Sequence, residues 1–191
     1  DALASAYGEW QQLSTDKAPL VRTCYHVPYG KMAKKAHQRR CQLDGRSEAE
    51  ADASYAVEVE PSLRLPGQVG NIYTGSLYLA LLSLLHHEAA ELAGQRIGLF
   101  SYGSGCAAEF FAGRVRPEAA ALLEQLDVTA PLRSRRKLSI PEYEELRRGD
   151  ATSDQRPAEM VGGGIGVDLP GQVRFSGIDP MERRVYTPAE G

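Results

Sequence analysis

Apolar residues recur at helical spacing from the start of the chain. Over residues 4–13 they fall at intervals of three and four positions, which predicts an amphipathic helix. Residues 20–26 form a short apolar run that favours a strand, and Pro28 and Gly30 mark a turn after it. Residues 31–42 then follow the pattern of a basic helix. The apolar face of the first helix carries Leu3, Tyr7, Trp10 and Leu13.

The longest apolar segment lies in the middle of the chain. Residues 72–92 are apolar on most sides, which is typical of a helix buried between two sheets, and Asn71 is suited to cap its first turn. Residues 96–102 are continuously apolar, as expected of a strand that is covered on both faces. A Gly-Ser-Gly break follows, and residues 106–115 predict a second strand that pairs with the first as a hairpin.

The segments on either side of these elements are less regular. Residues 46–53 are polar and predict a loop or a loose helix. Residues 57–65 predict an extended segment, and Pro61 places it at an edge or a bend. Residues 117–126 are rich in Ala and Leu and predict a helix.

The last part of the chain contains one clear helix signal and one hairpin signal. Ser139 and Glu142 have the spacing of a capping box, which predicts a helix that ends at Gly149. Residues 173–178 and 183–186 predict a closing hairpin. The order of strands and helices along the whole chain predicts an α/β fold.

Composition narrows the class of protein. The 191 residues are 42% hydrophobic and 25% charged, which is enough apolar material for a sizeable core. The net charge of −3 argues against nucleic acid as a partner. No apolar run approaches the roughly 18 residues of a membrane span. The chain opens on Asp1 without an initiator Met, which predicts a processed, trimmed or truncated chain.

Cysteine and histidine usage excludes two further kinds of site. Three cysteines at unrelated spacings fit neither a disulfide framework nor a zinc site, so we expect the protein to be located in the reducing cytoplasm. Cys24 and Cys41 have no identifiable base beside them, and Cys106 falls at the start of a strand, so all three are expected to be inert. The pair His86-His87 lacks further ligands, so no metal is expected.

The chemistry-bearing residues stand on turns at the ends of apolar runs, where open α/β sheets build their sites. His26 follows the first predicted strand, and an imidazole there can hydrogen-bond a carbonyl and protonate an alkoxide. Ser104 lies between Gly103 and Gly105, which let backbone N–H groups approach a ligand. The alternatives are a histidine satisfied by backbone groups, a tight turn and, for Asn71, a helix cap.

Two tyrosines and two lysines flank these residues. Tyr73 and Tyr102 either line a substrate pocket or contribute packing area. Lys31 and Lys35 are four residues apart and share one helix face, which suits either phosphate binding or a solvated surface.

The stretches around these residues resemble one known family. Residues 25–35, 69–85 and 97–110, which include Tyr-His-Val-Pro-Tyr-Gly-Lys-Met, Gly-Asn-Ile-Tyr-Thr-Gly-Ser and Ser-Tyr-Gly-Ser-Gly, are similar to the C-terminal half of hydroxymethylglutaryl-CoA synthase, a member of the thiolase superfamily. The resemblance implies that residues 1–191 form one thiolase-like domain. An N-terminal half completes it to a layered αβαβα sandwich.

The resemblance also implies an activity. In this family a cysteine takes the acetyl group of acetyl-CoA, a glutamate deprotonates it, and the carbanion attacks acetoacetyl-CoA. The cysteine and the glutamate belong to the N-terminal half, which is a required partner. No further cofactor is implied. The family works in the mevalonate pathway as a homodimer.

Residue roles carry over from the same resemblance. His26, Asn71 and Ser104 act on acetoacetyl-CoA, and Lys31 and Lys35 hold CoA. Ser104, between Gly103 and Gly105, helps to form the oxyanion hole. Tyr73 and Tyr102 flank this site and either line the acyl pocket or pack in the core.

Two other functions stay open. The first is the related polyketide β-branching synthase, which acts on an acyl carrier protein; Lys31 favours free CoA thioesters instead. The second is a non-catalytic CoA-binding or scaffold subunit. Whatever its function, the chain on its own is expected to expose a large apolar surface, because its central helix is expected to be covered by sheets on both sides.

Overall fold

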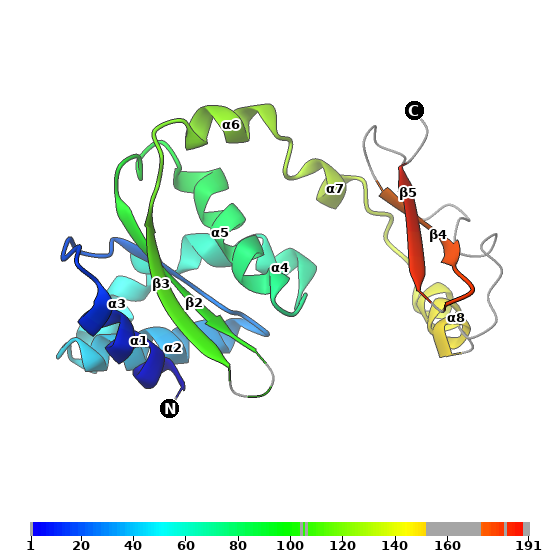
Figure 1. The fold of residues 1–191 in the computed structure, drawn as a ribbon. Coiled ribbons are helices and arrows are strands. Elements are labelled where there is room, and N and C mark those ends of the chain that lie inside the picture. Colours follow the sequence, from blue (N-terminus) through cyan, green and yellow to red (C-terminus); the bar gives the residue numbers. More distant parts are fainter. Residues whose placement is uncertain (1, 104, 106, 152–172, 182, 189–191) are drawn as a thin grey trace. The chain divides into compact units, whose positions relative to one another are not determined.

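The computed structural model describes residues 2–103, 105, 107–151, 173–181 and 183–188. Contacts along the chain divide it into two compact units, Asp1–Val128 and Thr129–Gly191. The first unit combines helices with a mixed sheet of three strands, which confirms the predicted α/β class (Figure 1). The prediction of one domain over residues 1–191 stays a prediction.

The first unit holds most of the regular structure. Its elements are α1 (Ala2–Leu13), β1 (Arg22–Tyr25), α2 (Gly30–Leu43), α3 (Glu48–Glu58), the 3-10 helix η1 (Glu60–Leu63), α4 (Pro66–Val69), α5 (Gly75–Glu88), β2 (Arg96–Tyr102), β3 (Ala108–Arg114) and α6 (Ala119–Gln125). The second unit contains α7 (Ala130–Arg133), α8 (Ile140–Ala151) and the antiparallel hairpin of β4 (Val173–Ile178) and β5 (Arg184–Pro188), which confirms the closing hairpin.

Three strands form the sheet of the first unit. β1 pairs with β2 in parallel, with Tyr25 opposite Phe100. β2 pairs with β3 antiparallel along its whole length, with Tyr102 opposite Ala108, and this confirms the predicted hairpin. Because β1 and β2 are parallel, their carboxyl ends lie at the same edge of the sheet.

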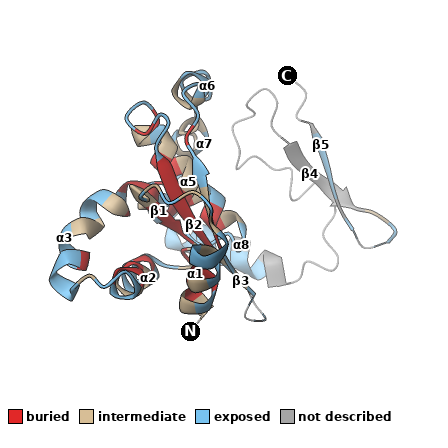
Figure 2. Cartoon of the chain, turned by 60° about the vertical axis from the view of Figure 1, so that its left-hand side comes forward, coloured by how far each residue is buried: buried red, intermediate tan, exposed pale blue. Residues whose placement is uncertain are grey.

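Successive side chains along the strands point to opposite faces of the sheet and pack into two apolar clusters, one on each face. Tyr25 and Phe100 pack on one face with α1, α2 and Val59. Cys24 and Leu99 pack on the other face with α5. The buried strand segments coloured in Figure 2 lie between these helices. β2 is thus covered on both faces, as its unbroken apolar run predicts.

For the polar stretch 46–53 the structure confirms the helical alternative and not the loop, because most of it belongs to the regular helix α3. The extended segment predicted for residues 57–65 was wrong, because this stretch is the end of α3 followed by η1. Ser47 and Glu50 form a full capping box at the start of α3, which fixes the helix where apolar periodicity is weak. Leu13 is 73% exposed, so only three members of the predicted first stripe face the protein.

The central helix also differs from its prediction. α5 begins at Gly75 rather than after Asn71, its N-cap is Thr74, and no side chain caps it. It buries one stripe, while Tyr78 on the opposite side is 63% exposed. Among the described residues, α5 is therefore covered on one side only. The buried stripe consists of Ser76, Leu77, Ala80, Ser83 and Leu84.

The predicted capping box in the second unit is confirmed. The Ser139 backbone N–H donates to the Glu142 carboxylate at 2.7 Å, and the Glu142 N–H donates back to the Ser139 hydroxyl at 3.4 Å. Hydrogen bonds from Arg136 and Ser139 lower the pKa of Glu142 to about 2. The helix continues to Ala151 instead of ending at Gly149.

Adding a side chain at Gly98 in β2 is expected to destabilise the fold. A Cβ there would lie 2.8 Å from Phe110 Cζ and 3.0 Å from Leu20 Cδ1. The Phe110 ring cannot retreat easily, because the rings of Tyr7 and Trp10 lie 4.8 and 5.0 Å from it, centroid to centroid. We expect Gly98→Ala to lower the free energy of unfolding by about 1–3 kcal/mol in chemical denaturation.

Gly113 in β3 is the matched control, because a Cβ at Gly113 meets no atom within 4 Å. Gly113→Ala should change the free energy of unfolding by less than about 1 kcal/mol. Equal losses in the two variants would contradict the packing described here.

A fully buried histidine predicts a dependence of stability on pH. The His37 side chain on α2 lies 2.8 Å from the Ser54 hydroxyl, measured from Nε2. Burial, followed by the charge of Arg40, lowers its pKa below the ordinary 6.5. Because the folded state disfavours the protonated ring, its contribution is complete above that ordinary value and is lost as the pH falls through the folded pKa.

We therefore expect the melting temperature to decrease as the pH is lowered from about 7 to about 5. His37→Gln should weaken this dependence on pH. His86→Gln, at an exposed position, is the control. An unchanged pH dependence in His37→Gln would refute the assignment.

Candidate functional site

The candidate site lies at the sheet edge where β1 and β2 end. His26 follows β1 directly, and its backbone N–H donates to the Phe100 carbonyl of β2 at 2.8 Å. α5 packs against β1 and β2, and the chain continues from its last turn to the start of β2 (Figure 1). The structure brings His26 and Tyr102 together in one cavity, and Asn71 is not among the residues that line it.

The His26 imidazole lines a cavity of about 390 Å³. Its Nδ1 atom is buried and has no hydrogen-bond partner in the part of the chain that the structure describes. Burial lowers the pKa of His26 below its ordinary value, so the neutral ring predominates near neutral pH. The residues that line this cavity are Ala2, Leu3, His26, Pro28, Met32, Lys35, Ala36, Arg39, Phe100 and Tyr102.

The basic helix α2 contributes one of the two predicted lysines to this cavity. Lys31 and Lys35 are both exposed, and Lys35 is among the lining residues whereas Lys31 is not. Lys34 points elsewhere and pairs with Asp52 at 3.1 Å. Arg39, one turn beyond Lys35, also lines the cavity; the four-residue spacing was a signal that could have identified it.

Asn71 is not the N-cap residue of α5, which corrects the cap alternative. It lies in an exposed loop before α5, where its Oδ1 accepts hydrogen bonds from the Tyr73 N–H at 2.9 Å and the Ser76 hydroxyl at 3.1 Å. Tyr73 has a positive φ of 56°, a conformation that non-glycine residues adopt rarely and that often marks functional loops.

The two predicted tyrosines are placed differently. Tyr102 lines the cavity with His26, whereas Tyr73 is 80% exposed and is absent from the lining. The Gly103 N–H donates to the Ala107 carbonyl at 2.8 Å and so serves the hairpin turn. Gly105 has a φ of 84°, which favours glycine. Ser104 and Cys106 lie outside the described residues.

A neutral imidazole in an apolar cavity with a nearby ammonium group can orient and polarise a carbonyl compound that carries a negative charge. Within the described ranges, no three His, Cys, Asp or Glu side chains are grouped to hold a metal ion. No described helix is long and apolar enough to cross a membrane.

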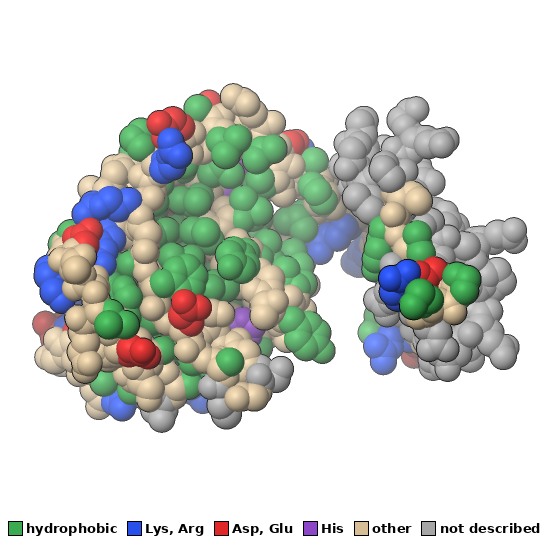
Figure 3. All heavy atoms as spheres, in the orientation of Figure 1, with side chains coloured by type: hydrophobic (Ala, Val, Ile, Leu, Met, Phe, Trp, Pro, Cys, Tyr) green, Lys and Arg blue, Asp and Glu red, His purple; other side chains and the backbone are tan. Residues whose placement is uncertain are grey.

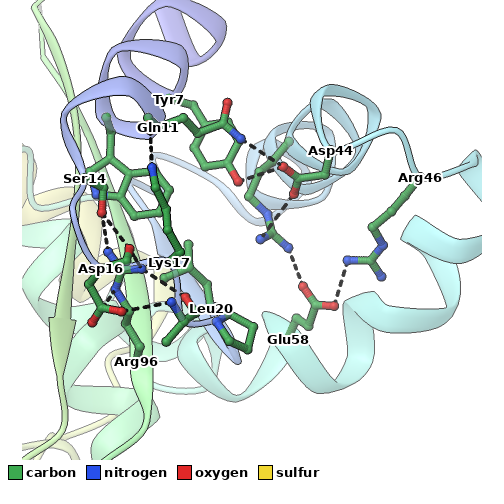
Figure 4. A pocket seen from close by; sticks show the side chains of 14 residues that line it. Tyr7, Gln11, Ser14, Asp16, Lys17, Leu20, Asp44, Arg46, Glu58 and Arg96 are labelled. Atoms are coloured by element: carbon green, nitrogen blue, oxygen red, sulfur yellow. Dashed lines mark hydrogen bonds and ion pairs between the residues drawn. The ribbon is translucent and has the colours of Figure 1, made fainter.

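A second cavity, of about 410 Å³, lies beside α1 and the loop that follows it (Figure 4). Its charged side chains pair with one another: Arg40 with Glu58 and Asp44, and Arg46 with Glu58 at 2.9 Å. Arg96 stacks on the Trp10 ring at 5.0 Å and donates to the Ser14 hydroxyl. Most of these charged groups are paired with one another, although the buried Nε of Arg40 has no hydrogen-bond partner among the described residues, and we assign the cavity a structural role.

The described cysteines are also structural. Cys24 and Cys41 are free and buried, and burial raises the pKa of both thiols. Contrary to expectation, a possible base lies beside Cys41, because its Sγ is 3.5 Å from His37 Nε2. Neither side chain is accessible, so the pair packs the core between α2 and α3.

The known sequences that are similar to this chain belong to one family. The family model described as hydroxymethylglutaryl-coenzyme A synthase C terminal matches residues 48–188. A hydroxymethylglutaryl-CoA synthase of Enterococcus faecalis is 44% identical over 131 residues, which are 69% of this chain and 33% of the relative. The mitochondrial enzyme of Rattus norvegicus is 41% identical over 68% of this chain and 27% of its own length.

Solved structures give the same result. MvaS in complex with 3-hydroxy-3-methylglutaryl coenzyme A has a TM-score of 0.75 at 38% identity and covers 98% of this chain. The HMG synthase of the curacin biosynthetic pathway has a TM-score of 0.78 at 29% identity. The chain spans 49% and 50% of these two proteins, and so about half of each.

Proposed function

The chain belongs to the hydroxymethylglutaryl-CoA synthase family, as a C-terminal half of its thiolase-like fold, and we propose that it supplies the acceptor side of such an enzyme. The complete enzyme condenses acetyl-CoA with acetoacetyl-CoA and releases hydroxymethylglutaryl-CoA and CoA. One observation carries the proposal: a partly buried, neutral imidazole, His26, lines a cavity that Lys35 also lines.

The chemistry assigned to this chain follows from that geometry. The carbanion of the acetylated cysteine in the N-terminal half attacks the ketone carbon of acetoacetyl-CoA. The electron pair of the C=O bond moves to oxygen, and an N–H of the neutral His26 ring donates a hydrogen bond to this oxygen. The proton that makes it a hydroxyl is the one that the glutamate took from the acetyl group, passed on through the His26 ring. Asn71 donates a hydrogen bond to the acyl chain or thioester carbonyl, and Ser104 contributes to the oxyanion hole. Water then cleaves the cysteine thioester and frees the cysteine.

The apolar surface of the first unit supports the need for an N-terminal half. Apolar side chains gather on the face shown in Figure 3. The exposed apolar side chains of this unit include Tyr78 of α5 and Leu122 of α6, which are 63% and 58% exposed. A cavity of about 530 Å³ on this unit is lined mainly by apolar residues of α5, α6, β2 and β3. An exposed apolar surface of this kind marks an interface. In our proposal the N-terminal half, with the cysteine nucleophile and the glutamate base, covers α5.

Free CoA thioesters are the proposed substrates, in the mevalonate pathway. Lys31 and Lys35 supply positive charge near the cavity for the CoA phosphates or pantetheine. The alternative acceptor is an acyl carrier protein. This alternative is supported by a relative, PksG of Bacillus subtilis, which is named as a polyketide biosynthesis 3-hydroxy-3-methylglutaryl-ACP synthase. PksG is 34% identical over 65% of this chain's length.

Two further features extend the proposal. The complete enzyme acts as a homodimer, which rests on the family resemblance. It works in the cytoplasm, which is consistent with the free thiols of Cys24 and Cys41. The alternative location is the mitochondrion, because one of the relatives is named as a mitochondrial enzyme.

Replacing His26 separates this function from a non-catalytic role. In the complete synthase, His26→Ala should slow condensation by about 10²- to 10⁴-fold, because the general acid is lost. Transfer of acetyl to the cysteine should change less than about twofold, since that step uses the other half of the site. Stopped reactions with labelled acetyl-CoA measure the two steps separately. His86→Ala, on the exposed end of α5, is the control, and equal loss of both half-reactions would rule out the assignment.

The two lysines should differ in effect. Lys35→Ala removes an ammonium group that lines the cavity and should raise the KM for acetoacetyl-CoA by about tenfold, whereas Lys31→Ala should raise it less. Steady-state kinetics with free CoA thioesters and with carrier-bound thioesters measure both effects. A greater loss with the carrier-bound substrate would favour the polyketide alternative.

A further inference from the structure

The loop before α5 contains a closed set of hydrogen bonds. Asn71 Oδ1 accepts from the Tyr73 N–H at 2.9 Å and from the Ser76 hydroxyl at 3.1 Å. The same hydroxyl oxygen accepts from the Ile72 N–H at 3.0 Å. Ser76 therefore bridges the backbone of the loop and the side chain of Asn71.

The donors and acceptors in this set fix which way the Asn71 amide faces. A backbone N–H can only donate, so the group that faces Tyr73 must be the carbonyl oxygen of Asn71. The Ser76 oxygen already accepts from Ile72, which directs its own proton to the same carbonyl oxygen. Both bonds hold the amide in one of its two orientations, with Nδ2 on the other side.

Ser76 is positioned to hold the Asn71 side chain in this orientation. It is 1% exposed and belongs to the buried stripe of α5, whereas Asn71 is exposed. An exposed asparagine side chain normally rotates and flips. In the described part of the chain, Asn71 Nδ2 makes no hydrogen bond, so its two N–H donors are available to a ligand.

We propose that Ser76 is a positioning residue that holds Asn71 so that its Nδ2 group, and not its oxygen, faces the acceptor substrate. The inference rests on the proposed function. Asn71 then acts strictly as a donor, and its partner on the substrate is an acceptor oxygen, that of the acyl chain or the thioester carbonyl. An orientation fixed before binding avoids the cost of ordering the side chain when the substrate arrives.

Ser83 shows that a buried serine on the same helix face need not have this role. It lies two turns beyond Ser76 and is 0% exposed. Its hydroxyl donates to the Pro61 carbonyl at 2.8 Å and accepts from the Leu65 N–H at 3.2 Å. Both partners are backbone groups of neighbouring segments, so Ser83 joins α5 to η1 and α4 and touches no candidate site residue. It is the matched control.

The test is a double-mutant cycle in the complete synthase, in which this chain is joined to an N-terminal half. Ser76→Ala should lower kcat/KM for condensation by about tenfold, with little change in the acetylation of the cysteine. In an Asn71→Ala background the same substitution should have no further effect, because Ser76 acts through Asn71. Ser83→Ala should leave both half-reactions unchanged per folded molecule. Additive losses from Ser76→Ala and Asn71→Ala would overturn the proposal.

Two further measurements separate failure of this inference from failure of the proposed function. Asn71→Asp keeps the acceptor oxygen and the loop but removes the donors, so condensation should fall at least as far as in Asn71→Ala. The side-chain amide of Asn71, followed by NMR relaxation, should lose order in Ser76→Ala and keep it in Ser83→Ala. This readout does not require activity. If the unsubstituted enzyme fails to condense its substrates, the proposed function fails, while unchanged amide order in Ser76→Ala would remove the positioning role.

Discussion

The parallel pairing of β1 with β2 is the constraint on which the candidate site depends. It places the carboxyl ends of both strands at one edge of the sheet, and the hydrogen bond from the His26 N–H to the Phe100 carbonyl extends the pairing to the first residue of the site. As a result, His26, which follows β1, and Tyr102, at the end of β2, line the same cavity.

The same sheet supports the proposed N-terminal partner. Its strands are covered on both faces, yet α5 itself is covered on one side only among the described residues and presents Tyr78 and its neighbours outward. In the proposed function this side meets the N-terminal half. The division of labour then follows the division of the fold: one half forms and activates the acetyl nucleophile, and this half holds and polarises the ketone.

Much of this arrangement could be predicted from the sequence, where the signals are local and strong. The apolar run of β2, the glycine break after it and the basic pattern of α2 each specify one element. For α3 the sequence leaves a loop and a loose helix open because its apolar spacing is weak, although Ser47 and Glu50 have the spacing of a capping box. The sequence also suggests a helix cap at Asn71, because a side chain that closes a local turn uses the same residue types as a cap.

The site was less predictable than the fold. The contacts of His37 with Cys41 and Ser54, and of Ser76 with Asn71, depend on side-chain orientations that no periodicity encodes. The chemical roles came from family resemblance rather than from spacing, because a histidine after a strand is compatible with many functions. Lys31, four residues from Lys35, shows the limit of spacing arguments, since only Lys35 lines the cavity.

The most direct test of the central claim is a crystal structure of the complete synthase with acetoacetyl-CoA bound. The account predicts that the ketone oxygen lies within about 2.6–3.2 Å of a ring nitrogen of His26, and that Asn71 Nδ2 donates to a second acyl oxygen. An acyl group bound away from the edge where β1 and β2 end, with His26 facing only protein, would contradict it.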